Sequence, residues 1–119
     1  MVDDPGASST TTLTLTIRRK WFDLIATGEK TEEYRRVSKW IHSRLFEKDN
    51  VTPRQYSYVR LRNGYSEKSP TIVCKWLGFR ELKNGVAKTY RNGLVVEYSD
   101  VVYAISLGPI VAHTAATAS

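Results

Sequence analysis

The stretch Leu13-Thr14-Leu15-Thr16-Ile17 alternates strictly between aliphatic and hydroxyl side chains, which predicts a β-strand with one buried face. Residues 19–27 then change to a helical spacing, in which Trp21 or Phe22 joins apolar side chains at residues 24–26 to form one stripe. Gly28 follows at the position where many helices end on a glycine. The chain is therefore expected to open with a strand and a short helix that stops at Gly28.

Strands dominate the rest of the chain. Ser38 can cap a second helix, and Asn-Gly pairs at residues 63–64, 84–85 and 92–93 indicate turns. The other expected strands are residues 30–35, 55–62, 71–82, 94–98 and 102–107. The order β-α-β-α-β-β-β-β lacks the regular alternation of a doubly wound sheet. We expect an α+β fold: a small, partly closed β-barrel of about five to six strands with two short helices packed on it.

The length of 119 residues is enough for one domain with one hydrophobic core. Residues 6–12 and 112–119 are small, polar and low in complexity, which is typical of unstructured ends. We therefore expect a disordered tail over residues 1–12, a folded domain over 13–110 and a second disordered tail over 111–119. Six side chains are expected in the core: Trp21, Phe22, Ile25, Trp40, Leu61 and Ile105.

Several classes of protein are excluded by simple counts. No apolar stretch approaches the roughly 18 residues that cross a bilayer, and the acidic N-terminus has no apolar core typical of a secretory signal. The single cysteine, Cys74, forms neither an internal disulfide nor a zinc cluster by itself and is expected to be buried. We expect a cytoplasmic protein, monomeric, with no metal, cofactor or membrane partner.

The charge balance favours an anionic partner. Eighteen Lys and Arg against twelve Asp and Glu give a net charge of +6. Because Asp3 and Asp4 precede residue 13, residues 13–110 carry 18 bases and 10 acids, a net charge of +8. A small domain this basic attracts polyanions, most often nucleic acid, although such a charge also serves solubility alone.

The densest polar cluster is Gly28-Glu29-Lys30-Thr31-Glu32-Glu33-Tyr34-Arg35. In an extended chain Thr31, Glu33 and Arg35 share one face, and Lys30 lies at the entrance of that strand. The carboxylate of Glu33 can then be held between two cations whose remaining N–H donors face a ligand. The alternative is a solvated strand of surface ion pairs.

A second candidate surface lies on the strand expected over residues 55–62. Tyr56, Tyr58, Arg60 and Arg62 share one of its faces. Aromatic rings that stack on bases, beside guanidinium groups that contact phosphates, are what binding of single-stranded nucleic acid requires. The alternative is that these side chains are amphipathic filler on a solvated face, with Val59 and Leu61 directed to the core.

The pattern Gly28-x-Lys30-x-x-Glu33-x-Arg35, placed after a short helix, resembles the motif of the ASCH domain, a member of the PUA-like superfamily. Similarity extends to residues 14–17 with 20–25, to Val59-Arg60-Leu61-Arg62-Asn63-Gly64-Tyr65, and to residues 102–108. These segments span nearly the whole expected domain. The segment over residues 59–65 is similar to one in small stand-alone bacterial and phage members.

The resemblance implies a PUA-like barrel with a cleft beside the Gly-x-Lys loop for RNA, single-stranded nucleic acid or a modified nucleoside. Lys30, Glu33, Arg35, Tyr58, Arg60 and Arg62 are the expected binding residues. Some compact relatives are amidohydrolases that deacetylate N4-acetylcytidine, using the motif lysine and a threonine that aligns with Glu33. Lys30 and Glu33 are then the expected catalytic pair, with a carboxylate in place of the hydroxyl. A third function class is a protein-interaction module with a basic face.

Overall fold

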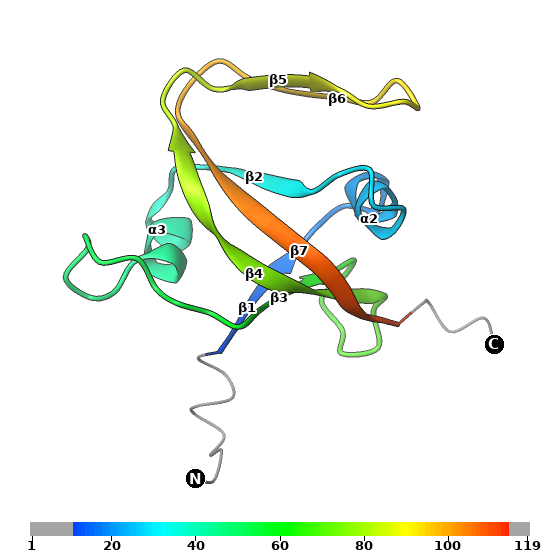
Figure 1. Cartoon of the computed structure of the whole chain (residues 1–119), viewed down its shortest axis with the longest axis horizontal. Coiled ribbons are helices and arrows are strands. Elements are labelled where there is room, and N and C mark those ends of the chain that lie inside the picture. The colour runs from blue at the N-terminus through cyan, green and yellow to red at the C-terminus, as the bar shows by residue number, and fades with distance from the viewer. Residues whose placement is uncertain (1–10, 115–119) are drawn as a thin grey trace, which may run out of the picture. The chain divides into compact units, whose positions relative to one another are not determined.

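The computed structural model describes residues 11–114 (Figure 1). Their strands and helices are β1 (Thr12–Thr16), α2 (Arg19–Ala26), β2 (Glu32–Arg36), α3 (Lys39–Leu45), β3 (Tyr58–Arg62), β4 (Thr71–Leu82), β5 (Val86–Thr89), β6 (Val95–Tyr98) and β7 (Val102–Thr114). None of the helices in this part of the chain has the length and apolar character needed to cross a membrane.

Hydrogen bonding joins five strands into one sheet in the order β1-β3-β4-β7-β2, while β5 and β6 form a separate antiparallel pair. β1 runs parallel to β3, β3 antiparallel to β4, and β2 antiparallel to β7. β1 and β2 are the two end strands of this order. The sheet is curled, in agreement with the expected partly closed barrel. The expected α+β class, with strands predominating and two short helices, is confirmed.

The described residues form two compact units, and β4 and β7 each contribute to both. The first unit contains residues 11–31, 55–77 and 107–114. Its core follows directly from strand alternation, because the inward side chains of β1, β3 and β4 are all at most 1% exposed: Leu13, Leu15, Val59, Leu61, Ile72 and Cys74. Helix α2 adds Phe22, Leu24 and Ile25 from its apolar stripe. The expectation that Cys74 is buried is confirmed.

The second unit contains residues 32–54 and 78–106. Helix α3 begins at a cap in which the Ser38 hydroxyl accepts a hydrogen bond from the Ile41 N–H at 3.1 Å, as the sequence predicts. Ile41 and Leu45, one turn apart, are buried. Phe46, Phe79 and Tyr103 form an aromatic cluster beside them, with ring centroids 5.3–6.0 Å apart.

The prediction that Trp40 belongs to the core is wrong. Its side chain is 47% exposed, and the Arg44 guanidinium lies 4.9 Å from the centroid of its ring. The reason is helical spacing: Ile41 and Leu45 already supply the inward face of this short helix, so Trp40 and Arg44, also four residues apart, share an outward face. Trp21 is only partly buried, whereas the other predicted core residues, Phe22, Ile25, Leu61 and Ile105, are buried.

Element boundaries differ from expectation at several places. β2 begins at Glu32 instead of residue 30, β3 begins at Tyr58 instead of residue 55, and β1 begins at Thr12, inside the expected N-terminal tail. β7 continues to Thr114, so residues 111–114 belong to a strand and the expected tail boundary at residue 110 is too early. The short strand β5 was not expected, because four residues give little periodicity; it is held by pairing Val86–Thr89 with Val95–Tyr98 across a turn at Gly93. The expected tails over residues 1–10 and 115–119 lie outside the described residues.

Candidate nucleotide pocket and basic sheet face

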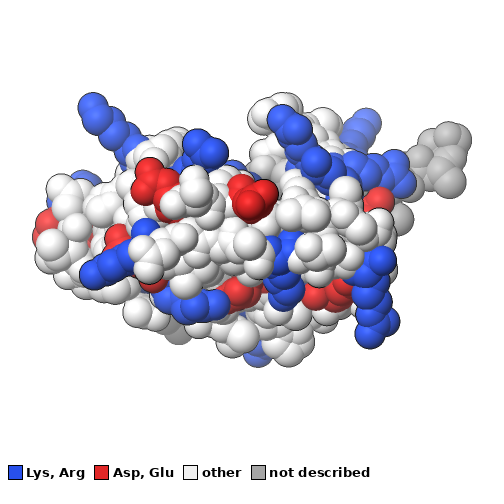
Figure 2. All heavy atoms as spheres, turned by 90° about the horizontal axis from the view of Figure 1, so that it is seen from above, with Lys and Arg blue, Asp and Glu red and all other residues white. Residues whose placement is uncertain are grey.

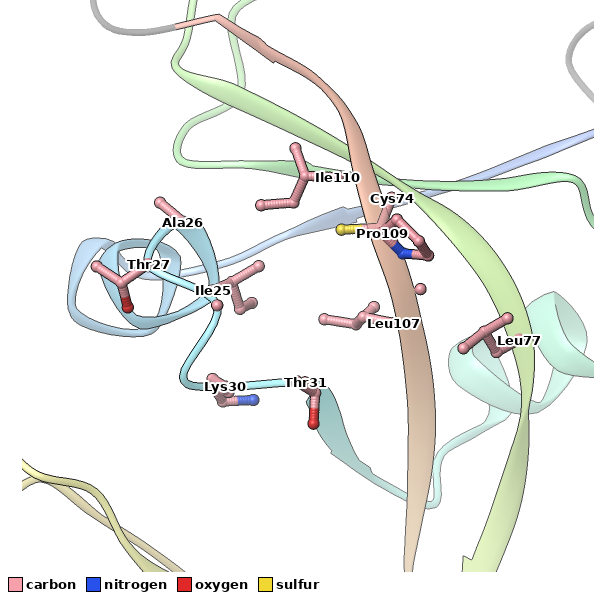
Figure 3. A pocket seen from close by; sticks show the side chains of 12 residues that line it. Ile25, Ala26, Thr27, Lys30, Thr31, Cys74, Leu77, Leu107, Pro109 and Ile110 are labelled. Carbon is pink, nitrogen blue, oxygen red and sulfur yellow. The ribbon is translucent and has the colours of Figure 1, made fainter.

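A pocket of about 580 Å³ lies in the first unit, beside the loop that follows α2. Its walls are mainly apolar. Ile25 on α2 points across the pocket toward Leu107 and Ile110 of β7, and Lys30 and Thr31 lie at one end (Figure 3). The remaining lining residues are Ala26, Thr27, Gly28, Cys74, Leu77, Gly108 and Pro109.

The end of α2 places Lys30 at this pocket. Gly28 has a φ of +86°, which reverses the chain at the position a C-terminal glycine commonly takes. Its N–H donates to the Ile25 carbonyl at 3.0 Å, and the Lys30 N–H returns to the Leu24 carbonyl at 3.0 Å. The Thr27 hydroxyl donates to that same carbonyl at 3.0 Å. Carbonyls that the helix leaves unbonded are thereby satisfied, and Lys30 is tied to the helix end.

Lys30 is 2% exposed, which is unusual for a lysine. Its ammonium nitrogen lies 5.9 Å from the centroid of the Trp21 ring, and the Lys20 ammonium lies 4.9 Å from it. These distances fall within the range of cation–π attraction. The indole therefore helps hold the lysine at the pocket, and partly buried Trp21 is a site residue that the sequence reading assigned to the core.

Of the four residues predicted to share this face, Tyr58, Arg60 and Arg62 lie on β3 in the first unit. Tyr56 precedes the strand, and its ring packs edge-on against Trp76 with ring centroids 5.0 Å apart. Tyr58 is 37% exposed, Arg60 and Arg62 are half-buried, and the intervening Val59 and Leu61 are fully buried. The Arg60 guanidinium donates from Nη1 to the Thr14 hydroxyl on β1 at 3.1 Å. The Nε of Arg62 is buried and has no hydrogen-bond partner among the described residues.

Glu33 and Arg35 belong to the second unit and share one face of β2, as expected for alternate strand residues. Arg35 donates from Nε to Oε2 of Glu33 at 3.0 Å, and the Glu33 carboxylate is almost fully buried. The negative charge of Glu33 therefore lies next to the positive charge of Arg35 on this strand.

Glu32, the residue before this pair, makes a long-range ion pair that the sequence does not predict. Glu32 accepts hydrogen bonds from Arg80 at 2.9 Å and from the Tyr34 hydroxyl at 2.9 Å. Burial, together with the hydrogen bond to Glu32, raises the pKa of Tyr34 well above its usual value. No local signal could reveal this contact, because Arg80 is 48 residues away from Glu32 in the chain.

Other polar candidates do not form a site. Burial raises the pKa of the Cys74 thiol to about 11, which leaves it protonated at neutral pH. His42 stacks on Phe46 with ring centroids 4.3 Å apart and contacts the Tyr103 hydroxyl, so it is part of the packing around α3. Within residues 11–114, no group of three or more His, Cys, Asp or Glu is placed to hold a metal ion.

Charge alone does not delimit a binding surface. Figure 2 shows lysine and arginine side chains distributed over one face of the protein, with acidic side chains among them. The informative features are therefore the pocket beside Lys30 and the face of β3. Comparison with protein-family models, curated proteins and solved structures found no match to this chain.

Proposed function

We propose that this protein is an RNA- or nucleotide-binding module that holds a nucleoside base, modified or not, in the pocket beside Lys30. The observation that carries the proposal is the position of this pocket. It is bordered by Gly28 and Lys30 of the Gly-x-Lys loop, where the resemblance to the ASCH domain places a ligand cleft. Its volume of about 580 Å³ lies within the usual range for small-molecule sites.

The chemistry of the walls suits a nucleobase. Ile25, Leu107 and Ile110 offer apolar surface to the faces of a planar ring. The Lys30 ammonium and the Thr31 hydroxyl provide donors for a carbonyl oxygen or ring nitrogen at the edge of that ring. A net charge of +6 favours attachment of the base to a phosphate or a polynucleotide. On this proposal the chain is a small PUA-like module that acts in the cytoplasm as a monomer.

Titration calorimetry with cytidine, uridine and N4-acetylcytidine tests the pocket. Ile110→Trp adds an indole at the pocket wall and is expected to abolish nucleoside binding. Val111→Trp is the matched control, because Val111 is the next residue of the same strand, is similarly exposed and does not line the pocket. Equal affinities for the two variants would contradict binding in this pocket, as would no binding of any nucleoside to the unmodified protein.

The second candidate function is hydrolysis of an N4-acetylated cytidine, favoured by the amine of Lys30 at the pocket. In that reaction water attacks the acetyl carbonyl, the bond from the carbonyl carbon to N4 breaks, and a proton passes to N4, which yields cytidine and acetate. Glu33 stands where the relatives have threonine and is paired with Arg35. This contact occupies Oε2 of the carboxylate that would have to accept a proton from water.

Chromatography of N4-acetylcytidine incubated with the protein separates the two functions. Cytidine that accumulates with the unmodified protein and disappears with Lys30→Met would establish the hydrolase. Methionine is the chosen replacement because it keeps an unbranched side chain in a position that is 2% exposed. Binding in calorimetry without turnover would instead support the binding module.

A further inference from the structure

The outward face of β1, β3 and β4 in the first unit is a continuous three-strand surface. Cross-strand register aligns Thr12 with Tyr58 and Lys75, Thr14 with Arg60 and Val73, and Thr16 with Arg62 and Thr71. All nine side chains are half-buried or exposed, whereas the residues between them on each strand are buried. We call these nine residues the arginine–threonine face.

From this arrangement we propose that the arginine–threonine face binds the phosphodiester backbone of a single-stranded nucleic acid, at a site separate from the nucleoside pocket. The inference goes beyond the proposed function and does not depend on it. The sequence of β3 alone predicts only a row of tyrosine and arginine side chains. Pairing of β3 with β1 and β4 places threonine hydroxyl groups and a third cation, Lys75, beside that row, so that the surface is three strands wide.

The charge of the face is complementary to a polyanion. It carries Arg60, Arg62 and Lys75, and none of its nine residues is acidic. Arg60 is held along the sheet by its hydrogen bond to the Thr14 hydroxyl, so little rotamer entropy is lost when its other N–H groups meet a phosphate. Arg62 is half-buried on the same face, and its Nε is buried with no hydrogen-bond partner among residues 11–114.

The neutral members of the face fit the same ligand. Threonine hydroxyls donate to phosphate oxygens alongside arginine, and four of the nine residues are threonines. Tyr58, at the end of the arginine row, exposes 37% of its surface and can stack on a base that is not paired. This combination favours a single strand, whose bases are accessible, over a duplex, whose bases are already stacked.

The face and the pocket are made of different residues. None of the nine residues of the face lines the pocket, although the two are adjacent along β4, where Leu77 of the pocket follows Lys75 of the face by two residues. A nucleoside held by the pocket residues therefore leaves the nine residues of the face available. The two sites can be tested independently with ligands that fit only one of them.

Fluorescence polarisation with labelled oligo(U) and oligo(dT) of about twelve nucleotides tests this proposal. The double variant Arg60→Gln/Arg62→Gln is expected to bind roughly 25-fold more weakly at about 0.1 M salt. Its slope of log affinity against log salt should be shallower by about 1.4, because each lost phosphate contact on a single strand removes about 0.7. Equal effects on oligo(U) and oligo(dT) indicate a backbone contact, and a duplex of the same length should bind more weakly.

The matched control is Arg19→Gln/Lys68→Gln, which removes the same charge from exposed positions of the same unit. It should change affinity far less than the arginine pair. The pocket is tested separately by calorimetry with nucleosides, which carry no phosphodiester, so failure of the pocket and failure of the face are distinguishable. Equal losses in the two double variants, or a salt slope unchanged by removal of Arg60 and Arg62, would overturn the proposal.

Discussion

Replacement of Gly28 by alanine is expected to lower the free energy of unfolding by about 1–2 kcal/mol, the cost of a left-handed backbone for a residue with a Cβ atom. The φ of Gly28 is +86°, and a Cβ built there meets no other heavy atom within 4 Å. Backbone strain is therefore the whole of the expected loss. Asparagine, which tolerates this conformation better, should lose less than alanine.

Gly85 is the matched comparison, because its φ of +80° is nearly the same while its surroundings are not. A Cβ there would come within 2.7 Å of the carbonyl carbon of Tyr98 and 3.0 Å of the Asp100 carbonyl oxygen. Both are backbone atoms, so the turn itself must shift. Gly85→Ala should therefore add a steric cost of about 1–3 kcal/mol to the same strain.

Urea unfolding of both variants, followed by circular dichroism, measures the two losses, and unchanged m-values would show that the comparison is sound. Equal losses of stability for Gly28→Ala and Gly85→Ala would refute the reasoning that a Cβ atom has room at Gly28 and clashes with the backbone at Gly85. A Gly28→Ala protein as stable as the unmodified one would show that the chain does not reverse there through a left-handed residue. The hydrogen bond from the Lys30 N–H to the Leu24 carbonyl would then not depend on a left-handed backbone at Gly28.

Three further results are expected. Burial raises the pKa of the Cys74 thiol from its ordinary value of 9.0 to about 11. The folded state therefore keeps the thiol proton to higher pH than the unfolded state, and this contribution to stability is present below pH 9 and is lost as the pH rises toward 11. Urea unfolding curves should show a loss of roughly 2–3 kcal/mol over this range that Cys74→Ala lacks. Glu33→Gln removes the buried partner of Arg35 and should cost about 1–3 kcal/mol in urea unfolding, whereas a neutral effect would mean that the ion pair contributes nothing. Ser38→Ala removes the cap that accepts the Ile41 N–H and should cost about 1 kcal/mol, with Ser38→Asp close to the unmodified protein in the same assay.

Much of the local structure could be predicted from the sequence because it depends on neighbours in the chain. Strict alternation at residues 13–17 predicts which side of β1 is buried, and Leu13 and Leu15 are at most 1% exposed. The glycine that ends α2 and the serine that begins α3 act through hydrogen bonds within four residues. Trp40 shows the limit of such patterns, since composition suggests burial and only the placement of a short helix decides which of its sides is covered.

For the candidate sites, the sequence by itself determined the placing of Lys30 after a glycine-terminated helix and the single face that Tyr58, Arg60 and Arg62 share on β3. The tertiary structure decided what surrounds them. Parallel pairing of β1 with β3 brings threonines beside the arginines, and residues 107–110 of β7 complete the pocket whose other wall is α2. These contacts join segments more than 40 residues apart in the chain. Periodicity specifies which way a side chain faces, but the strand or helix it meets is set by packing of the whole chain.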